Sequence, residues 1–545
     1  MGFRGSIRIK RRLLILTLSL CLASVGAVFA SLTLKAVAQS QTPPGPDRAT
    51  VVTVDYTKYT WWMMQWSNGN LACKFTVSHE GLPTLDDVYN NCDQRVYDKW
   101  SVQQPCTLTN TSLCTGYYAV MIGSEPATKQ VSSVLAAPIV QVTLENCDPV
   151  YTSSTSICEK DPIMVLTGVE PIDGYKITSI EGMFGDQPFS CGAICRLRLP
   201  ITDESGTTLK FWAYSSYGDS SVVFNALVRV AKSSVGDPDQ SFWYVDVLSS
   251  QWAGVPLASC VEDWSVLPPV GGPPEWISTP TESEKLGTDI PYSYLAANLI
   301  RSGAVDASVC LDGGISPDGG ASACGMDQAR PAVTAWQNQF DDLILSVAKE
   351  SGVPAHLLKN LFAKESQFWP GINQKQDVGL GQLTEQGADT TLLWNPSFFF
   401  RFCPTVMDSG QCSKGYLGLD DNMQEYARQA LINSVSALCD NCPLGIDVER
   451  AKFSISVFAQ TLLANCGQAG QLVENFTGDT AGKSATYEDL WKFTLANYNA
   501  GPGCLGDAID ATQIAGQPFT WENVSSHFST GCATAINYVN DISSP

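Results

Sequence analysis

The chain has 545 residues, of which 44% are hydrophobic and 10% aromatic, and its formal net charge is −21. This length predicts two to four domains, and the apolar content is sufficient to fill their cores, which excludes general disorder. The strongly negative charge argues against nucleic acid or an anionic lipid surface as a binding partner.

The first 38 residues have the pattern of a secretory signal peptide. Basic residues within 4–12 precede an apolar run over 13–30, and Ala-Val-Ala at 36–38 is a small-residue cleavage site. The apolar run also approaches the length of a bilayer span, so an uncleaved membrane tether stays open as an alternative. We therefore expect an exported bacterial protein, secreted or associated with the cell envelope, in which the polar, proline-rich residues 39–50 form a tether.

The cysteines agree with export. Of the 19 cysteines, 18 follow the signal, and a large even number in an exported chain predicts disulfides. A cut between Cys195 and Cys260 leaves eight on one side and ten on the other, so each half can pair internally. Cys439 and Cys442 have zinc or redox spacing, but the chain has three histidines and no second pair at zinc-ribbon spacing. We expect structural disulfides, with no metal and no other cofactor.

Two β-rich domains are expected after the tether. In the first, over 51–147, short β-branched runs separated by a turn at 67–70 favour strands. Trp61, Trp62 and Trp66 lie in this region. Such a cluster most often belongs to a hydrophobic core, and the alternative is a platform on which sugar rings stack.

The second β-rich domain is expected over 148–234, with strand-like runs at 164–168 and 207–214. The stretch TTLKFWAYSSYGDSS, followed by FNALVRV, covers 207–230. It resembles the closing strands of bacterial surface immunoglobulin-like domains. The resemblance implies an Ig-like β-sandwich and carries no information about chemistry.

Residues 235–330 are rich in proline, glycine, serine and aspartate, with runs such as PPVGGPP and DGGISPDGG. This composition predicts a linker between the β-rich modules and the C-terminal part of the chain.

A mainly helical domain is expected over 331–545. Apolar residues recur at helical spacing from Trp336 to Val347, Gly352 is a plausible helix end, and Pro354 opens a second helix. Further helices are expected over 423–438, 451–466 and 487–498. The predicted fold class is therefore multidomain, with N-terminal all-β modules followed by a mainly α domain.

Glu365 lies on the apolar side of the second helix, seven residues after Leu358 and four after Leu361. Burial there would disfavour the charged form and raise the pKa of the carboxyl. A carboxylic acid that stays protonated near neutral pH is what cleavage of a glycosidic bond requires. Helical position alone favours an ordinary glutamate at the helix surface or C-terminal end, and only the motifs that follow change this expectation. The same tetrapeptide, Ala-Lys-Glu-Ser, also occurs at 348–351, but Glu350 precedes a helix end and no motif follows it.

Two further motifs follow Glu365 in order. Gly-Leu-Gly-Gln at 379–382 begins fourteen residues after Glu365, and its glycines let backbone and substrate approach closely. Gln382 offers both a donor and an acceptor to an amide or a sugar hydroxyl. Ala-Asn-Tyr-Asn-Ala-Gly-Pro-Gly at 496–503 ends a helix with polar tips and a forced turn.

Together, Glu-Ser, Gly-Leu-x-Gln and Tyr-Asn-Ala-Gly-Pro-Gly resemble the soluble lytic transglycosylases and, more distantly, goose-type lysozymes, over about residues 335–545. The resemblance implies a lysozyme-like α domain that acts on the MurNAc–GlcNAc bond of peptidoglycan glycan strands. It implies Glu365 as the catalytic acid/base. The substrate-binding residues that it implies are Ser366, Gly379, Gln382, Tyr498 and Asn499.

The chain departs from this family in two places. Gly381 replaces the usual methionine of Gly-Leu-Met-Gln, and an insertion over 395–442 interrupts the usual pattern. Both departures would change how the glycan strand is gripped, and neither removes the acid.

The family mechanism uses one carboxyl twice. Glu365 would protonate the glycosidic oxygen and then accept the proton of the MurNAc 6-hydroxyl, which closes a 1,6-anhydro ring. A lysozyme-like hydrolase would instead need a base that positions water, with Asp377 and Asp389 as the nearest candidates. Thr384 stands where goose-type lysozymes place an aspartate, which favours non-hydrolytic cleavage. An inactive surface protein that binds the cell wall is the third alternative.

Overall fold

The computed structural model describes residues 43–102, 106, 113–150, 155–234, 241–254, 256–270, 272–371 and 377–544. The predicted signal over 1–38, with its cleavage site and its alternative as an anchor, lies outside these residues. The chain divides into two compact units, and the smaller one consists of Pro46–Ala137 with Pro171–Gly174. Among the described helices, none has the length and apolar character needed to cross a membrane.

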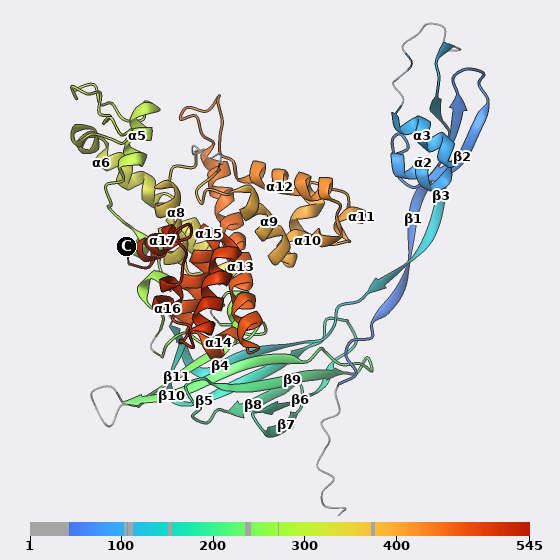
Figure 1. The fold of residues 1–545 in the computed structure, drawn as a ribbon. Coiled ribbons are helices and arrows are strands. Elements are labelled where there is room, and N and C mark those ends of the chain that lie inside the picture. Colours follow the sequence, from blue (N-terminus) through green and yellow to red (C-terminus); the bar gives the residue numbers. More distant parts are fainter. Residues whose placement is uncertain are drawn as a thin grey trace, which may run out of the picture. The chain divides into compact units, whose positions relative to one another are not determined.

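The smaller unit is a three-stranded antiparallel sheet with two helices against one face (Figure 1). Its strands, in sheet order, are β2 (Leu71–Val77), β1 (Ala49–Gln65) and β3 (Tyr117–Val134), and its helices are α2 (Leu85–Asn91) and α3 (Gln94–Val102). Trp61 and Met63 of β1 are buried in a core that includes Val88 of α2 and Val96 of α3. Helices therefore protect one face of the sheet from water.

The larger unit begins with an eight-stranded antiparallel sheet. Its strands are β4 (Ile139–Val150), β5 (Thr155–Val169), β6 (Ile177–Phe184), β7 (Gln187–Cys191), β8 (Ile194–Arg198), β9 (Thr207–Ser215), β10 (Phe224–Ser234) and β11 (Ser241–Leu248). Their order is β4-β5-β11-β10-β9-β6-β7, and β8 pairs with β5. The N-terminal part of β5 pairs with β11 and its C-terminal part with β8, so β5 joins two parts of the sheet.

Both expected boundaries of this β region need correction. The boundary expected at 147/148 falls inside β4, because Cys147 and Asp148 both pair with β5, in the same strand as the buried Val140 and Val142. The boundary expected at 234 omits β11, in which Val245 and Val247 are buried. An antiparallel β-rich region followed by a mostly helical region is confirmed as the overall order.

The segment 235–330 is folded, which corrects its interpretation as a linker. Besides β11 it contains α4 (Ser259–Trp264), η2 (Glu275–Ile277), η3 (Ser283–Leu286), α5 (Ser293–Arg301) and the start of α6 (Ala323–Asn338). Its proline and glycine runs are interspersed with apolar side chains, and Trp264, Trp276 and Leu295 are buried. The expected boundary at Pro331 falls inside α6.

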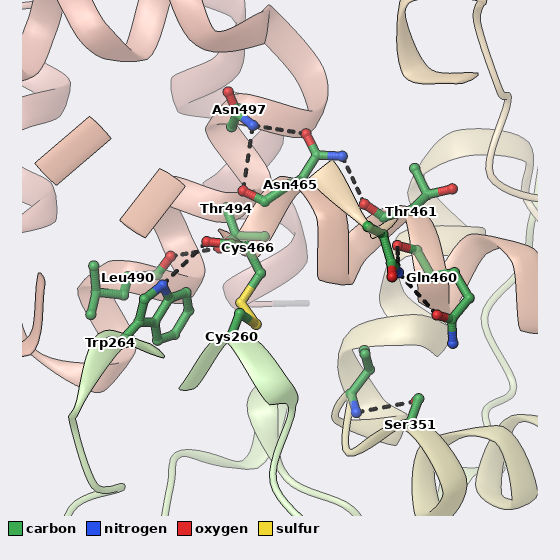
Figure 2. The surroundings of a disulfide bond; sticks show 12 residues. Cys260, Trp264, Ser351, Gln460, Thr461, Asn465, Cys466, Leu490, Thr494 and Asn497 are labelled. Carbon is green, nitrogen blue, oxygen red and sulfur yellow. Dashed lines mark hydrogen bonds between the residues drawn. A yellow bond between two sulfur atoms is a disulfide. The ribbon is translucent and has the colours of Figure 1, made fainter. Parts of the chain in front are cut away.

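Figure 2 shows how α4 is attached to the helical core. Cys260 forms a disulfide with Cys466 of α13, 206 residues away. Trp264 donates its indole N–H to the Cys466 carbonyl at 3.2 Å and packs edge-on against Trp491. A side chain at Gly470 would meet the Trp264 ring at 2.4 Å, so this glycine makes room for the indole. The segment expected to be a linker is therefore part of the helical core.

The remaining helices confirm the expected mainly α region. They are α7 (Asp341–Ser351), α8 (Ala355–Ser366), α9 (Glu385–Trp394), α10 (Pro396–Phe402), η4 (Cys403–Thr405), α11 (Ser409–Cys412), η5 (Tyr416–Gly418), α12 (Asp421–Val435), α13 (Val448–Thr477), α14 (Ala481–Ser484), α15 (Tyr487–Ile514), α16 (Trp521–Ser526) and α17 (Thr534–Ser543). The long helices α13 and α15 pack side by side at its centre (Figure 1). Gly352 ends α7 with a left-handed φ of 72°, as predicted, and Gly501 breaks α15 with a φ of 81°.

All 18 cysteines that follow residue 38 are paired in nine disulfides. Four bonds lie within the first eight cysteines (73–92, 106–114, 147–158, 191–195) and five within the last ten (260–466, 310–324, 403–412, 439–442, 504–532). The predicted division between Cys195 and Cys260 is confirmed, and Cys439 pairs with Cys442. So many disulfides indicate an oxidising, extracytoplasmic environment.

Candidate active site

Helix α8 presents Glu365 in its last turn. Leu357, Leu358, Leu361 and Phe362 of this helix are fully buried, so their packing fixes its rotation about its axis. The sequence places Glu365 on the edge of this apolar stripe, and the structure finds its side chain half-buried.

The turn that follows Glu365 is anchored by the segment that was expected to be a linker. Gln367 and Phe368 take left-handed φ values of 48° and 62°, which few residues adopt without support from their neighbours. The Gln367 side chain accepts a hydrogen bond from the backbone N–H of Tyr294 in α5 at 2.8 Å. Trp336 of α6 donates its indole N–H to the Phe368 carbonyl at 2.9 Å. Helices α5 and α6 thus fix the position of the catalytic candidate.

The surroundings of Glu365 raise its pKa to about 7. Burial is the main cause, because it disfavours the charged carboxylate, and the nearby charge of Asp377 raises the pKa further. A hydrogen bond from Tyr538 and the charge of Lys364 act in the opposite direction. A substantial fraction of Glu365 is therefore protonated at neutral pH, as a general acid requires.

Tyr538 of α17 is a site residue that the sequence reading missed. Its hydroxyl donates to Oε1 of Glu365 at 2.5 Å, although 173 residues separate the two in the chain. The helical spacing of Ala535, Tyr538, Val539 and Ile542 could have predicted a buried tyrosine. That pattern does not predict that the tyrosine hydroxyl hydrogen-bonds to Glu365.

Two hydroxyls fix the loop that carries the Gly-Leu-Gly-Gln motif. Ser366 is buried and donates to the Leu380 carbonyl at 2.7 Å, whereas Tyr498 of α15 donates to the Gly381 carbonyl at 2.7 Å. The structure thus brings together the three motifs that the sequence analysis singled out. In this structure Ser366 and Tyr498 position the motif loop beside α8. Contact of either residue with substrate stays a prediction.

The loop itself depends on its glycines. Gly379 has a left-handed φ of 79°, and a side chain there would approach the Val435 carbonyl to 2.9 Å. Gln382, with a φ of 51°, donates its side-chain amide to the carbonyls of Gly379 at 2.6 Å and Gly371 at 3.3 Å. Part of the hydrogen-bonding capacity of Gln382 therefore stabilises the loop.

The departure at Gly381 has a physical explanation in Phe458 of α13. A Cβ at position 381 would meet the Phe458 ring at 2.4 Å, so no larger residue fits without movement. Phe458 is fully buried and packs edge-on against Phe362 of α8. The phenylalanine ring occupies the space beside the loop that a methionine at 381 would need.

Asn499 and Asp389, the two remaining polar candidates, do not contact the motif loop in any hydrogen bond described for them. Asn499 is exposed on α15, close to the break at Gly501. Asp389 accepts hydrogen bonds from Tyr416 at 2.5 Å and from Arg428 at 3.2 Å, both supplied by the insertion over 395–442. The Asp389 carboxylate is therefore engaged in this cluster. The charge of Asp377 acts on Glu365.

A separate cavity of about 730 Å³ borders another side of α8. Its lining includes His356, Lys364 and Asp541 but not Glu365. Among the described residues, no group of three or more His, Cys, Asp or Glu side chains is placed to hold a metal ion.

Comparison of the chain with models of known protein families, with curated proteins and with solved structures finds no match. The resemblance to lytic transglycosylases therefore rests on the three motifs and on the geometry that brings them together.

Proposed function

We propose that the chain is a peptidoglycan lytic transglycosylase that cleaves the MurNAc–GlcNAc β-1,4 bond and leaves 1,6-anhydroMurNAc ends. The observation that carries this proposal is the environment of Glu365, whose pKa is raised to about 7 beside a loop with the family's motif. Remodelling of the producer's own cell wall fits the acidic chain better than attack on the anionic walls of other cells.

In the proposed reaction Glu365 acts first as an acid and then as a base. It delivers its proton to the glycosidic oxygen as the bond to the MurNAc anomeric carbon breaks, and the acetamido group of the substrate stabilises the resulting cation. The Glu365 carboxylate next accepts the proton of the MurNAc 6-hydroxyl, whose oxygen bonds to the anomeric carbon. Tyr538 holds Oε1 throughout, so the other carboxyl oxygen is available to move the proton.

A second candidate is hydrolysis of the same bond, and Asp377 is the observation that favours it. Its charge acts on Glu365, so a second carboxylate is near the acid. An aspartate there could activate water from the opposite face of the sugar, as inverting glycosidases do. Transglycosylation remains the leading proposal for two reasons. It needs only one carboxyl group, and the motifs that resemble the lytic transglycosylases occur in the chain in the family's order.

Mass spectrometry of fragments released from purified peptidoglycan tests both proposals. The chain is kept under oxidising conditions, and Glu365→Gln is the matched inactive variant. We expect anhydro-muropeptides from the unaltered chain and none from the variant. Hydrated, reducing ends would assign the chain as a hydrolase, and no release by either protein would leave the inactive wall-binding alternative.

We further propose that the chain is secreted or associated with the bacterial cell envelope, and that its sheet over 139–248 is an Ig-like positioning module. The disulfides support the first proposal. For the second, the stretch that resembles immunoglobulin-like domains forms the adjacent antiparallel strands β9 and β10. The spectrum of peptides from the exported chain would show whether the N-terminal segment is removed.

A further inference from the structure

One face of the sheet in the smaller unit carries aromatic side chains that the core of that unit does not use. Trp61 and Met63 of β1 belong to the core formed with α2 and α3. Because successive side chains of a strand point to opposite faces, Trp62 and Met64 lie on the face away from the helices. The tryptophan cluster noted in the sequence is therefore divided between a core and a second face.

The strand register places polar and aromatic neighbours around these two residues. Trp62 pairs with Lys74 of β2, and Met64 pairs with Tyr118 of β3. The Trp66 ring lies against Tyr118, with their centroids 4.2 Å apart. We call the following set the aromatic strip: Trp62, Met64, Trp66, Lys74, Thr76 and Tyr118.

The strip is partly open to solvent and has the dimensions of a short stretch of polymer. The three rings and Met64 are half-buried, whereas Lys74 and Thr76 are exposed. Trp66 is four positions after Trp62 and directly follows the end of β1 at Gln65, so at ~3.3 Å per residue the strip extends for about 13 Å. The strip is thus long enough for consecutive rings of a linear ligand.

We propose that the aromatic strip binds the glycan strand of peptidoglycan and holds the chain on its substrate. This inference rests on the proposed function for the identity of the glycan. Flat amphipathic rings fit the C–H face of a sugar, while the exposed Lys74 ammonium and Thr76 hydroxyl can hydrogen-bond its substituents. Lys74 is the one charged member of the strip in a chain of net charge −21, and it complements the carboxylates of peptidoglycan stem peptides.

Co-sedimentation of the full-length chain with insoluble peptidoglycan sacculi tests the proposal. All proteins carry Glu365→Gln, so that bound glycan is not cleaved. We expect Trp62→Ala with Trp66→Ala to weaken binding by about tenfold or more. Tyr89→Ala is the matched control, because Tyr89 is an exposed aromatic of α2 in the same unit.

A second variant separates loss of contact from misfolding. Trp62→Phe with Trp66→Tyr keeps two flat rings, and we expect it to retain most of the binding that the alanine variant loses. Equal binding by the alanine variant and the Tyr89→Ala control would overturn the proposal. Equal loss in the ring-retaining and alanine variants would also overturn it.

Cleavage of soluble muropeptide oligomers by the unaltered chain is measured in parallel. Cleavage without tryptophan-dependent binding would reject the aromatic strip and keep the proposed function. Tryptophan-dependent binding without cleavage would support the strip as a glycan site and reject the enzymatic proposal.

Discussion

Two regions of the helical core share the tetrapeptide Ala-Lys-Glu-Ser, at 348–351 in α7 and at 363–366 in α8. Both copies end their helix, and both are followed by a residue with a left-handed φ, Gly352 and Gln367. Local sequence and local backbone are therefore nearly the same. Glu350 is exposed, whereas Glu365 is half-buried against Tyr538 and close enough to Asp377 for their charges to interact.

The serines show the same contrast. Ser351 donates to the Val347 carbonyl of its own helix, at 2.7 Å. Ser366 lies 3.2 Å from the equivalent Phe362 carbonyl but also reaches the Leu380 carbonyl of the motif loop, at 2.7 Å. The difference between the two copies lies in what the rest of the chain brings to each of them. The same four residues thus yield an exposed glutamate in one place and a half-buried acid in another.

The largest expected effect separates the two glutamates by activity. Glu365→Gln should lower the rate of peptidoglycan cleavage by about 10²–10⁴-fold, since general acid catalysis is lost. Glu350→Gln should leave the rate unchanged, because its side chain is exposed in a different helix. Release of soluble fragments from sacculi measures both. A similar loss of cleavage rate in both variants would contradict the distinction between Glu365 and Glu350.

The dependence of folding stability on pH should also distinguish Glu365 from Glu350. Burial raises the Glu365 pKa in the folded chain to about 7 from its usual value of 4.5, so the unfolded state loses this proton first as the pH rises. The stabilising contribution of protonated Glu365 is complete below about pH 4.5 and is lost as the pH rises through about 7. Relative to the unaltered chain, Glu365→Gln should therefore gain stability over this range, by about 1–3 kcal/mol. Thermal melts at pH 4.5 and pH 8 measure the gain, and Glu350→Gln should show none.

The serines provide a smaller contrast. Ser366→Ala removes the hydrogen bond that ties the motif loop to α8, so we expect cleavage to fall by about tenfold. Ser351→Ala removes a bond within α7 and serves as the control. Steady-state rates of cleavage of a soluble muropeptide oligomer measure the difference between the two variants. Equal rates for the two variants would mean that the loop keeps its place without Ser366.

The smallest expected effects are opposite shifts in the pH–rate profile. Cleavage should decline as the pH rises through about 7, because Glu365 loses its proton. Asp377→Asn removes a negative charge and should move this decline to lower pH. Tyr538→Phe removes a donor to the carboxylate and should move it to higher pH. Shifts in the same direction would contradict the assigned environment.

Much of the helical region could be predicted from sequence because its signals are local. Apolar spacing predicts α8, Gly352 marks a helix end, and the division of the cysteines between the two halves follows from counting. The single helical run expected from Trp336 to Val347 is instead divided between α6 and α7, with the break at Gln339 and Phe340. The segment 235–330 was missed because its composition is that of a linker. Its few buried side chains, such as Trp264, find their partners in α13 and α15, far along the chain.

Local sequence patterns likewise predict only part of the candidate site. The motifs at Glu365, 379–382 and Tyr498 could be aligned in order, and the structure brings them together. The bond from Tyr538 depends on the docking of α17 against α8, which no local pattern specifies. The tight contact of Gly381 with Phe458 likewise belongs to tertiary packing.

Carbon-13 NMR of the chain labelled at glutamate side-chain carboxyls tests the contrast between the two copies most directly. We predict one carboxyl resonance that titrates with a midpoint near pH 7, that is absent from Glu365→Gln and that is retained in Glu350→Gln. If the resonance that Glu365→Gln removes instead titrates near 4.5, the usual value for a glutamate, Glu365 is not held as a protonated acid at neutral pH. That result would contradict the proposed catalytic role.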